Sequence, residues 1–345
     1  METQPTTNGY YDAMLPIMSV PSLQLLILQA AVILVFFVHQ SNGDIIISGN
    51  GQIEGGKFRY FFNNRTRACT NVILLGVGTG MTTADYNLVS KEMVQQGNEI
   101  LAIVTDHTPG FVFKNSKKDY IKVTNAIVAN LHSLIPICDN AYSTTTTTRM
   151  MISSQKKIIV AGHSASGGTA WNCLFQLAFR PDGFLGLDPF QLDPHATTQL
   201  RIPSLNIGFS ETTCLVTVDD AAKASYETSG KDHRVLYLIN NTSSSESNHG
   251  VNSKDDTTTF ANSSGPTTGH CSFTDRGCFG PICPVRVGDA WVRASVGFSI
   301  RAFVQSLWTG VYHKQDYILP RSYPTTKAGA APALYGLYVN EDQVV

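Results

Sequence analysis

The polar and apolar positions of this chain define two kinds of segment that alternate over most of its length. Short apolar runs predict buried strands, at residues 57–62, 71–77, 99–105, 157–161, 184–188, 204–208 and 234–239. Longer segments with apolar residues at helical spacing predict helices, at residues 85–96, 118–133, 168–179 and 290–307. Strands that alternate with helices are typical of an α/β fold, with a mostly parallel central sheet and helices on both faces.

The N-terminal part differs from this pattern because it is apolar over a long stretch. Residues 14–38 carry no charge, and no Lys or Arg precedes Lys57. A spanning helix needs about 20 apolar residues and a signal peptide fewer; a buried first helix of the fold is the alternative. Because turn-forming residues at 40–43 precede a strand-like run, we expect residues 1–43 to be a leader, either a signal peptide or a signal anchor.

Such a leader sends the chain to the secretory or endomembrane route, as a secreted, membrane-anchored or plastid-directed protein, and associates it with a membrane through its apolar segment. Sequons at Asn64, Asn240, Asn241 and Asn262 are compatible with secretion. We expect one folded domain at 44–312, interrupted by exposed Ser/Thr/Asn-rich loops at 139–154 and 240–269. Residues 313–345 are expected to form a C-terminal tail, either a surface strap or a disordered end.

The chain is poor in charge, and this narrows its partners. Its 345 residues include 25 Lys and Arg against 26 Asp and Glu, so that only 15% of the chain is charged, where a soluble domain usually has about 25%. Binding to a phosphate backbone needs a basic surface. We therefore expect no nucleic-acid partner.

The segment G-H-S-A-S-G-G at 162–168 carries the strongest local signal in the chain. It follows an apolar strand and precedes a predicted helix, which is the context of a nucleophile elbow, a sharp turn with a reactive serine at its tip. Ser164 is the candidate nucleophile. The usual pattern is G-x-S-x-G, and here Ser166 stands at the second glycine position. A phosphate-binding glycine loop is disfavoured because no P-loop lysine follows.

The candidate acid and base follow the serine in chain order. Asp188 ends an apolar strand, which places its carboxylate at the same sheet edge as Ser164; Glu211, after the next strand, is the alternative acid. His270 is the candidate base and His249 the reserve. The histidine would take the serine proton and return it to the leaving alcohol, while the acid fixes the histidine tautomer.

An oxyanion hole needs two backbone N–H groups. One is expected from Ala165, directly after the nucleophile, and the other from Gly78 or Thr79 in the glycine-rich segment after the strand at 71–77.

The chain has seven cysteines, an odd number, so at least one thiol would stay unpaired if disulfides form. Cys271 is expected to pack beside His270, and Cys278 and Cys283 are expected to form a disulfide that pins the loop behind it. A zinc site is disfavoured, because structural zinc usually takes paired, closely spaced ligands. The remaining cysteines are scattered and are expected to be small buried apolar residues, at Cys69, Cys138, Cys173 and Cys214.

With these residues placed, the chain resembles the α/β-hydrolase superfamily over residues 71–307, and within it the branch of chlorophyllases, platelet-activating-factor acetylhydrolases and polyester hydrolases. The likeness to chlorophyllases lies in the elbow at 162–168, Gly-Leu-Asp-Pro at 186–189, the run at 202–208 and Gly-His at 269–270. The acetylhydrolases share His-x-x-Phe-x-Asp, found at 270–275. The chain departs from chlorophyllases in having Ala165-Ser166 where they have Arg-Gly.

The resemblance implies Asp188 as the acid, no metal and no organic cofactor. It implies a serine carboxylic-ester hydrolase that forms an acyl-enzyme on a hydrophobic small-molecule ester, best matched by chlorophyll, with lipid or polyester esters as alternatives. An inactive hydrolase-fold binding protein is the alternative from another class.

Overall fold

The computed structural model describes residues 45–66, 69–95, 99–107, 116–138, 156–190, 202–209, 234–239, 269–276, 290–311 and 337–339. All of them belong to one compact unit of the chain, Asp44–Val345. The expected leader at 1–43 lies outside the described residues. Among the helices that the structure describes, none has the length and apolar character needed to cross a membrane.

The core of the fold is a nine-stranded sheet in the order β1-β2-β4-β3-β5-β6-β7-β8-β9. The six strands from β3 to β8 run parallel to one another, while β1, β2 and β9 are added in antiparallel fashion at the two sides of this group. All seven strands predicted from sequence are present. The bounds are β1 Ile46–Ile53, β2 Gly56–Asn63, β3 Asn71–Gly76, β4 Ile100–Asp106, β5 Lys157–His163, β6 Gly183–Leu187, β7 Ser204–Phe209, β8 Arg234–Ile239 and β9 Leu337–Val339.

Strand β9 lies in the segment that the sequence suggested to be a surface strap or a disordered end. Its three residues instead extend the sheet beside β8, with Leu337 opposite Tyr237. Such a short strand carries no pattern that could be recognised in sequence, because periodicity needs several residues on each face.

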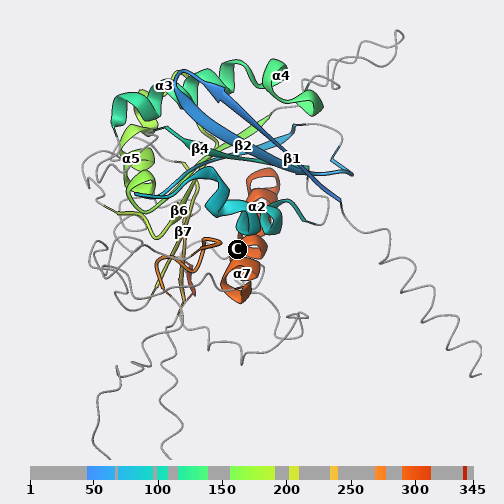
Figure 1. Cartoon of the computed structure of the whole chain (residues 1–345). Helices are drawn as coiled ribbons and strands as arrows, with labels where there is room; N and C mark the ends of the chain where they lie inside the picture. Colours follow the sequence, from blue (N-terminus) through green and yellow to red (C-terminus); the bar gives the residue numbers. More distant parts are fainter. Residues whose placement is uncertain are drawn as a thin grey trace, which may run out of the picture. The chain divides into compact units, whose positions relative to one another are not determined.

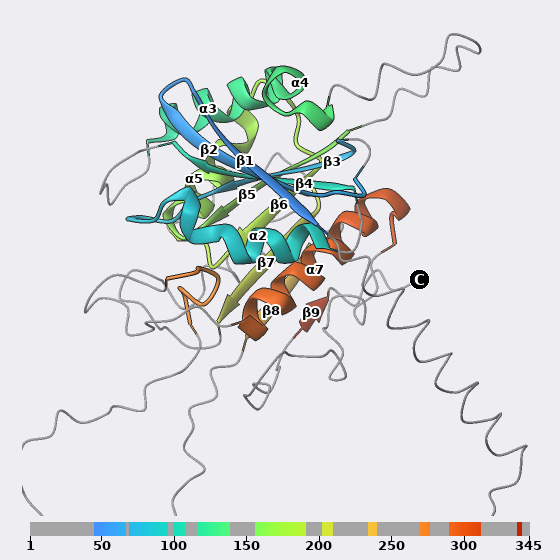
Figure 2. The ribbon, with the colours of Figure 1, turned by 45° about the vertical axis from the view of Figure 1, so that its right-hand side comes forward.

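Helices cover both faces of the sheet, as Figures 1 and 2 show. Helices α2 and α7 lie together on one face, and α3, α4 and α5 lie on the other. Residues of β3 alternate between the two cores: Ile73 and Leu75 pack toward α2 and α7, while Val72 and Leu74 pack toward α3. The helical bounds are η1 Thr83–Tyr86, α2 Asn87–Val94, α3 Lys117–Ala129, α4 Leu131–Leu134, η3 Pro136–Cys138, α5 Ala165–Cys173, η5 Leu174–Gln176 and α7 Ala290–Thr309.

Two helices differ from the sequence prediction. The segment predicted as one helix at 118–133 divides at Asn130, where the backbone leaves the helical region, into α3 and α4. Helix α5 begins at Ala165, three residues earlier than predicted. Small and flexible residues at 166–168 have weak helix propensity, and the tight strand-to-helix turn places them in the first turn of the helix nevertheless.

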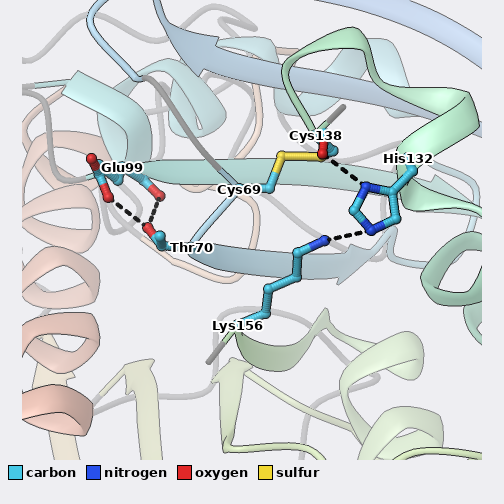
Figure 3. The surroundings of a disulfide bond; sticks show 6 residues. All are labelled: Cys69, Thr70, Glu99, His132, Cys138 and Lys156. Atoms are coloured by element: carbon cyan, nitrogen blue, oxygen red, sulfur yellow. Dashed lines mark hydrogen bonds between the residues drawn. A yellow bond between two sulfur atoms is a disulfide. The ribbon is translucent and has the colours of Figure 1, made fainter. Parts of the chain in front are cut away.

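A disulfide between Cys69 and Cys138 joins the segment just before β3 to η3, at a sequence separation of 69. Figure 3 shows its surroundings: the His132 ring donates through Nδ1 to the carbonyl of Cys138 at 2.8 Å and accepts from the Lys156 ammonium at 3.1 Å. The expectation that both cysteines are simple apolar residues was therefore wrong, because sequence gives no sign that they meet. The Cys173 thiol is free and buried, as expected.

Candidate active site

Ser164 occupies a strained turn between β5 and α5. Its φ of 55° and ψ of −130° lie in a region that costs a non-glycine residue free energy. Three backbone hydrogen bonds hold this conformation: Ser164 N–H donates to Leu187 O at 3.1 Å, and the Ser164 carbonyl accepts from Gly168 at 3.2 Å and Phe190 at 2.9 Å. The sequence prediction of a sharp strand-to-helix turn at this serine thus matches the local geometry.

Glycines on both sides of the turn permit this close approach of strand and helix. A Cβ on Gly162 would lie 2.6 Å from the backbone nitrogen of Gly167, and a Cβ on Gly167 would lie 2.7 Å from the carbonyl oxygen of Gly162. Both distances are shorter than any ordinary contact. Only glycine therefore fits at these two positions.

Ser166, which departs from the usual glycine pattern, has a specific place in the structure. It is fully buried, and its hydroxyl donates to the carbonyl of Val77 in the loop after β3. The side chain fits because the residue facing it is Gly76, where a Cβ would lie 2.8 Å from the Ser166 Cβ. The Ser166 hydroxyl thus links the turn at Ser164 to the loop after β3.

The structure brings Asp188 and His270 together, although they are 82 positions apart in the sequence. The Nδ1 atom of His270 lies 2.6 Å from Oδ2 of Asp188, and both residues are buried. With Nδ1–H donated to the carboxylate, Nε2 of a neutral His270 is the nitrogen that can accept a proton. Asp188 follows β6 directly, with a φ of 42° and its N–H on Ile207 O at 2.6 Å.

The loop that carries His270 is hydrogen-bonded to η1 and to the first turn of α2. The Asp275 N–H donates to the Asp85 carbonyl at 2.7 Å, and the Asp275 carboxylate accepts from the N–H of Leu88 at 3.0 Å. Burial raises the pKa of Asp275 above its ordinary value. Phe273, one turn after His270, is fully buried against Phe209 and the ring of His163.

Cys271 of the same loop is disulfide-bonded, which corrects the expectation that it only packs beside His270. Its partner and the expected pair Cys278 and Cys283 lie outside the described residues, and so do the alternative acid Glu211 and the reserve base His249.

Sequence reasoning missed Tyr86 and gave His163 no role beyond the motif. The two side chains are buried and joined by a hydrogen bond of 2.6 Å between Tyr86 Oη and His163 Nδ1. The Gly78 N–H donates to the same tyrosine hydroxyl at 2.8 Å, and His163 Nε2 lies 2.9 Å from the backbone carbonyl oxygen of His270. Burial and the neighbouring His270 hold the pKa of His163 well below its ordinary value.

These contacts change the choice of oxyanion donors. The N–H of Gly78 is engaged with Tyr86, and the N–H of Val77 donates to Thr105 O at 3.1 Å. The expectation that Gly78 supplies a donor therefore does not fit, since a backbone N–H has one proton to give. Thr79 and Ala165 remain; Ala165 is the first residue of α5, where the N–H has no partner within the helix.

The loop after β3 lies directly beside Ser164. A Cβ on Gly78 would lie 3.2 Å from Cβ of Ser164, so this loop lies close to the Ser164 side chain. The Ser164 hydroxyl makes no hydrogen bond to any residue that the structure describes. In the same part of the chain, no cluster of three or more metal-ligating side chains is found.

Comparisons with known proteins add little to this geometry. No protein-family model matches the chain, and no curated protein matches it significantly. Among solved structures, the crystal structure of a predicted CIB-like hydrolase from Thermoplasma acidophilum at 1.45 Å resolution matches with a TM-score of 0.42 and 13% identity, over 58% of this chain and 89% of that one. A likeness of this size carries no argument about activity. The sheet of six parallel neighbouring strands, with a serine on the sharp turn from β5 to α5, gives this chain the α/β-hydrolase fold.

Proposed function

We propose that this protein is a serine carboxylic-ester hydrolase in which Ser164, His270 and Asp188 form the catalytic triad. The observation that carries the proposal is the 2.6 Å bond between His270 and Asp188 at the sheet edge where Ser164 occupies its strained turn. Such a turn exposes a serine hydroxyl at the tip of the strand, which is its function in enzymes of this fold.

The reaction has two steps. In the first, Ser164 Oγ bonds to the ester carbonyl carbon while its proton passes to Nε2 of His270; the carbon–oxygen bond to the alcohol then breaks, and His270 returns the proton to the leaving alkoxide. In the second, a water molecule gives a proton to His270, attacks the acyl-enzyme and releases the acid, and Ser164 regains its proton.

Asp188 and two backbone N–H groups assist both steps. The Asp188 carboxylate keeps the proton of neutral His270 on Nδ1 and stabilises the imidazolium that forms. The N–H groups of Ala165 and Thr79 are the donors for the oxyanion of the tetrahedral intermediate. Removing one such donor typically lowers kcat by about 100- to 1,000-fold.

For the substrate we propose a hydrophobic, uncharged ester, with chlorophyll first and a lipid or polyester ester as alternatives. Support comes from the resemblance to chlorophyllases at 162–168 and 186–189 and from the low charge of the chain. Neither feature distinguishes a pigment from a lipid. Parallel assays with chlorophyll a, a short-chain phospholipid and p-nitrophenyl butyrate would distinguish these substrates, because only a chlorophyllase-like enzyme is expected to form chlorophyllide.

The triad is tested by labelling with a fluorophosphonate probe, which reacts with an activated serine. The wild type should be labelled, and Ser164→Ala should not. The matched control is Ser90→Ala, which removes another buried serine hydroxyl, from helix α2. This variant should still be labelled. Labelling that survives Ser164→Ala would refute the proposal, and a wild type that never reacts would favour a binding protein.

We also propose that the chain enters an oxidising compartment through its leader at 1–43. The disulfide between Cys69 and Cys138 supports this route, because such bonds persist in secreted and endomembrane proteins and are rare in the cytosol. A fluorescent fusion of residues 1–43 should reach the secretory route or a membrane, and a diffuse cytosolic signal would contradict the proposal.

A further inference from the structure

Two buried polar side chains of the site, Tyr86 and His163, take no part in the mechanism above. They are 0% and 1% exposed, and burying polar groups in an apolar core costs free energy unless each finds a partner. Both find partners in a single chain of hydrogen bonds that starts in the loop after β3 and ends on the backbone of His270.

The direction of this chain follows from its first member. The Gly78 N–H can only donate, so it donates to Tyr86 Oη, whose own proton is then directed at Nδ1 of His163. Since Nδ1 accepts, a neutral His163 carries its proton on Nε2, and this N–H donates to the carbonyl oxygen of His270. The low pKa of His163 agrees with a neutral ring.

We propose that Tyr86 and His163 are positioning residues. They hold the loop after β3, which carries the oxyanion donor Thr79 and is called the oxyanion loop below, and the catalytic histidine His270 in fixed positions relative to Ser164. The inference rests on the proposed function. The nucleophile, the oxyanion donors and the catalytic histidine of an esterase must be held within a fraction of an ångström of their productive geometry. Here the oxyanion loop and His270 come from distant parts of the sequence, and this hydrogen-bond chain is a direct connection between them.

The segment that carries Tyr86 supports this connection with a second one. Asp85, the residue before it, accepts the N–H of Asp275 on its carbonyl and pairs through its carboxylate with Arg276 at 3.1 Å. Asp85 of η1 thus contacts two successive residues of the histidine loop, Asp275 and Arg276. A core tyrosine that only needed to satisfy its hydroxyl would require one partner, whereas this one joins the loop after β3 to His163, the last residue of β5.

Removal of the Tyr86 hydroxyl leaves the Gly78 N–H without an acceptor and His163 Nδ1 without a donor. The hydrogen-bonded link from the loop after β3 to His163 is then lost, while the Nε2–H of His163 keeps the carbonyl oxygen of His270 as its acceptor. We expect Tyr86→Phe to lower kcat for p-nitrophenyl butyrate by roughly 10- to 100-fold, as displacements of catalytic groups do, with KM within about twofold of the wild type. A fall in kcat alone indicates loss of transition-state geometry and not of substrate binding.

The matched control is Tyr120→Phe. Tyr120 is as deeply buried as Tyr86 but lies on α3, on the opposite face of the sheet, and its hydroxyl takes no part in the chain of bonds. This variant should keep the wild-type kcat. If Tyr86→Phe also keeps kcat within twofold, or if it raises KM without lowering kcat, the inference is overturned.

A second measurement does not depend on the folding of any variant. In the wild type, ¹⁵N NMR of labelled histidines should find His163 as the Nε2–H tautomer at neutral pH. An Nδ1–H tautomer would reverse the hydrogen bonds and overturn the inference.

The two proposals fail in different ways. A wild type that does not react with the fluorophosphonate probe refutes the esterase and with it the positioning role. A wild type that reacts, with a Tyr86→Phe variant that hydrolyses the ester equally fast, leaves the esterase standing and refutes the positioning role alone.

Discussion

Removal of the disulfide between Cys69 and Cys138 should destabilise the folded domain by several kcal/mol. The bond closes a loop over a sequence separation of 69 residues. In the chain-entropy model, a loop of this length restricts the unfolded state by about 4.4 kcal/mol at 25 °C. This is a large share of the roughly 5–15 kcal/mol by which domains are typically stable.

Urea denaturation of the Cys69→Ala/Cys138→Ala variant, with and without dithiothreitol, measures this contribution. A reductant also breaks the disulfide of Cys271, so the informative quantity is the difference between the two responses. Dithiothreitol should lower the free energy of unfolding of the wild type by about 4.4 kcal/mol more than that of the variant. With an m-value of about 3 kcal/mol/M, this equals a difference of about 1.5 M in the urea midpoint.

The matched control is Cys173→Ala, because Cys173 is a buried cysteine with a free thiol. Its response to dithiothreitol should equal that of the wild type. If the responses of the wild type and the double variant differ by less than about 1 kcal/mol, the loop-closure argument fails.

Three further predictions concern single side chains. Asp188→Asn should lower kcat by on the order of 10,000-fold in an ester assay, because it disturbs the tautomer of the catalytic histidine; near-normal activity would transfer the role of the acid to Glu211. Ser166→Ala removes the hydroxyl bonded to Val77 O and should lower the free energy of unfolding, measured in urea, by about 1 kcal/mol, whereas an unchanged midpoint would show that the bond contributes nothing. Burial lowers the pKa of His107 to about 4 from 6.5, so between these pH values the unfolded chain binds a proton that the folded chain does not. The free energy of unfolding should therefore fall by about 3 kcal/mol as the pH drops from 6.5 to 4. In urea titrations across this range, His107→Phe should lose this part of the pH dependence.

Much of the fold and the principal residues of the candidate site could be proposed from sequence because their signals are local. A buried strand such as β3 is apolar throughout, and an elbow needs small residues around one serine, so both patterns are complete within a few residues. Asp188 could be chosen because parallel strands end at one edge of the sheet. His270 was chosen on chain order and on a resemblance, and its Nδ1 atom is hydrogen-bonded to the carboxylate of Asp188.

Other features depend on residues that meet only in the folded chain. Nothing near Cys69 in sequence indicates Cys138, and nothing near Tyr86 indicates that its hydroxyl would take the N–H of Gly78 and remove it from the oxyanion hole. The tolerance for Ser166 likewise depends on Gly76, a residue of another strand.

The sequence by itself therefore determined the alternation of strands and helices, the position of the sharp turn at Ser164 and the residue types of the candidate site. Only the tertiary structure decided which backbone N–H groups near Ser164 are engaged, that Cys69 is bonded to Cys138 and which polar side chains connect the loop after β3 to His270. The physical reason is that secondary structure follows from the periodicity of neighbouring residues, whereas a hydrogen bond or a disulfide needs two groups within a few ångströms of each other. That proximity is fixed by the packing of the whole sheet and its helices.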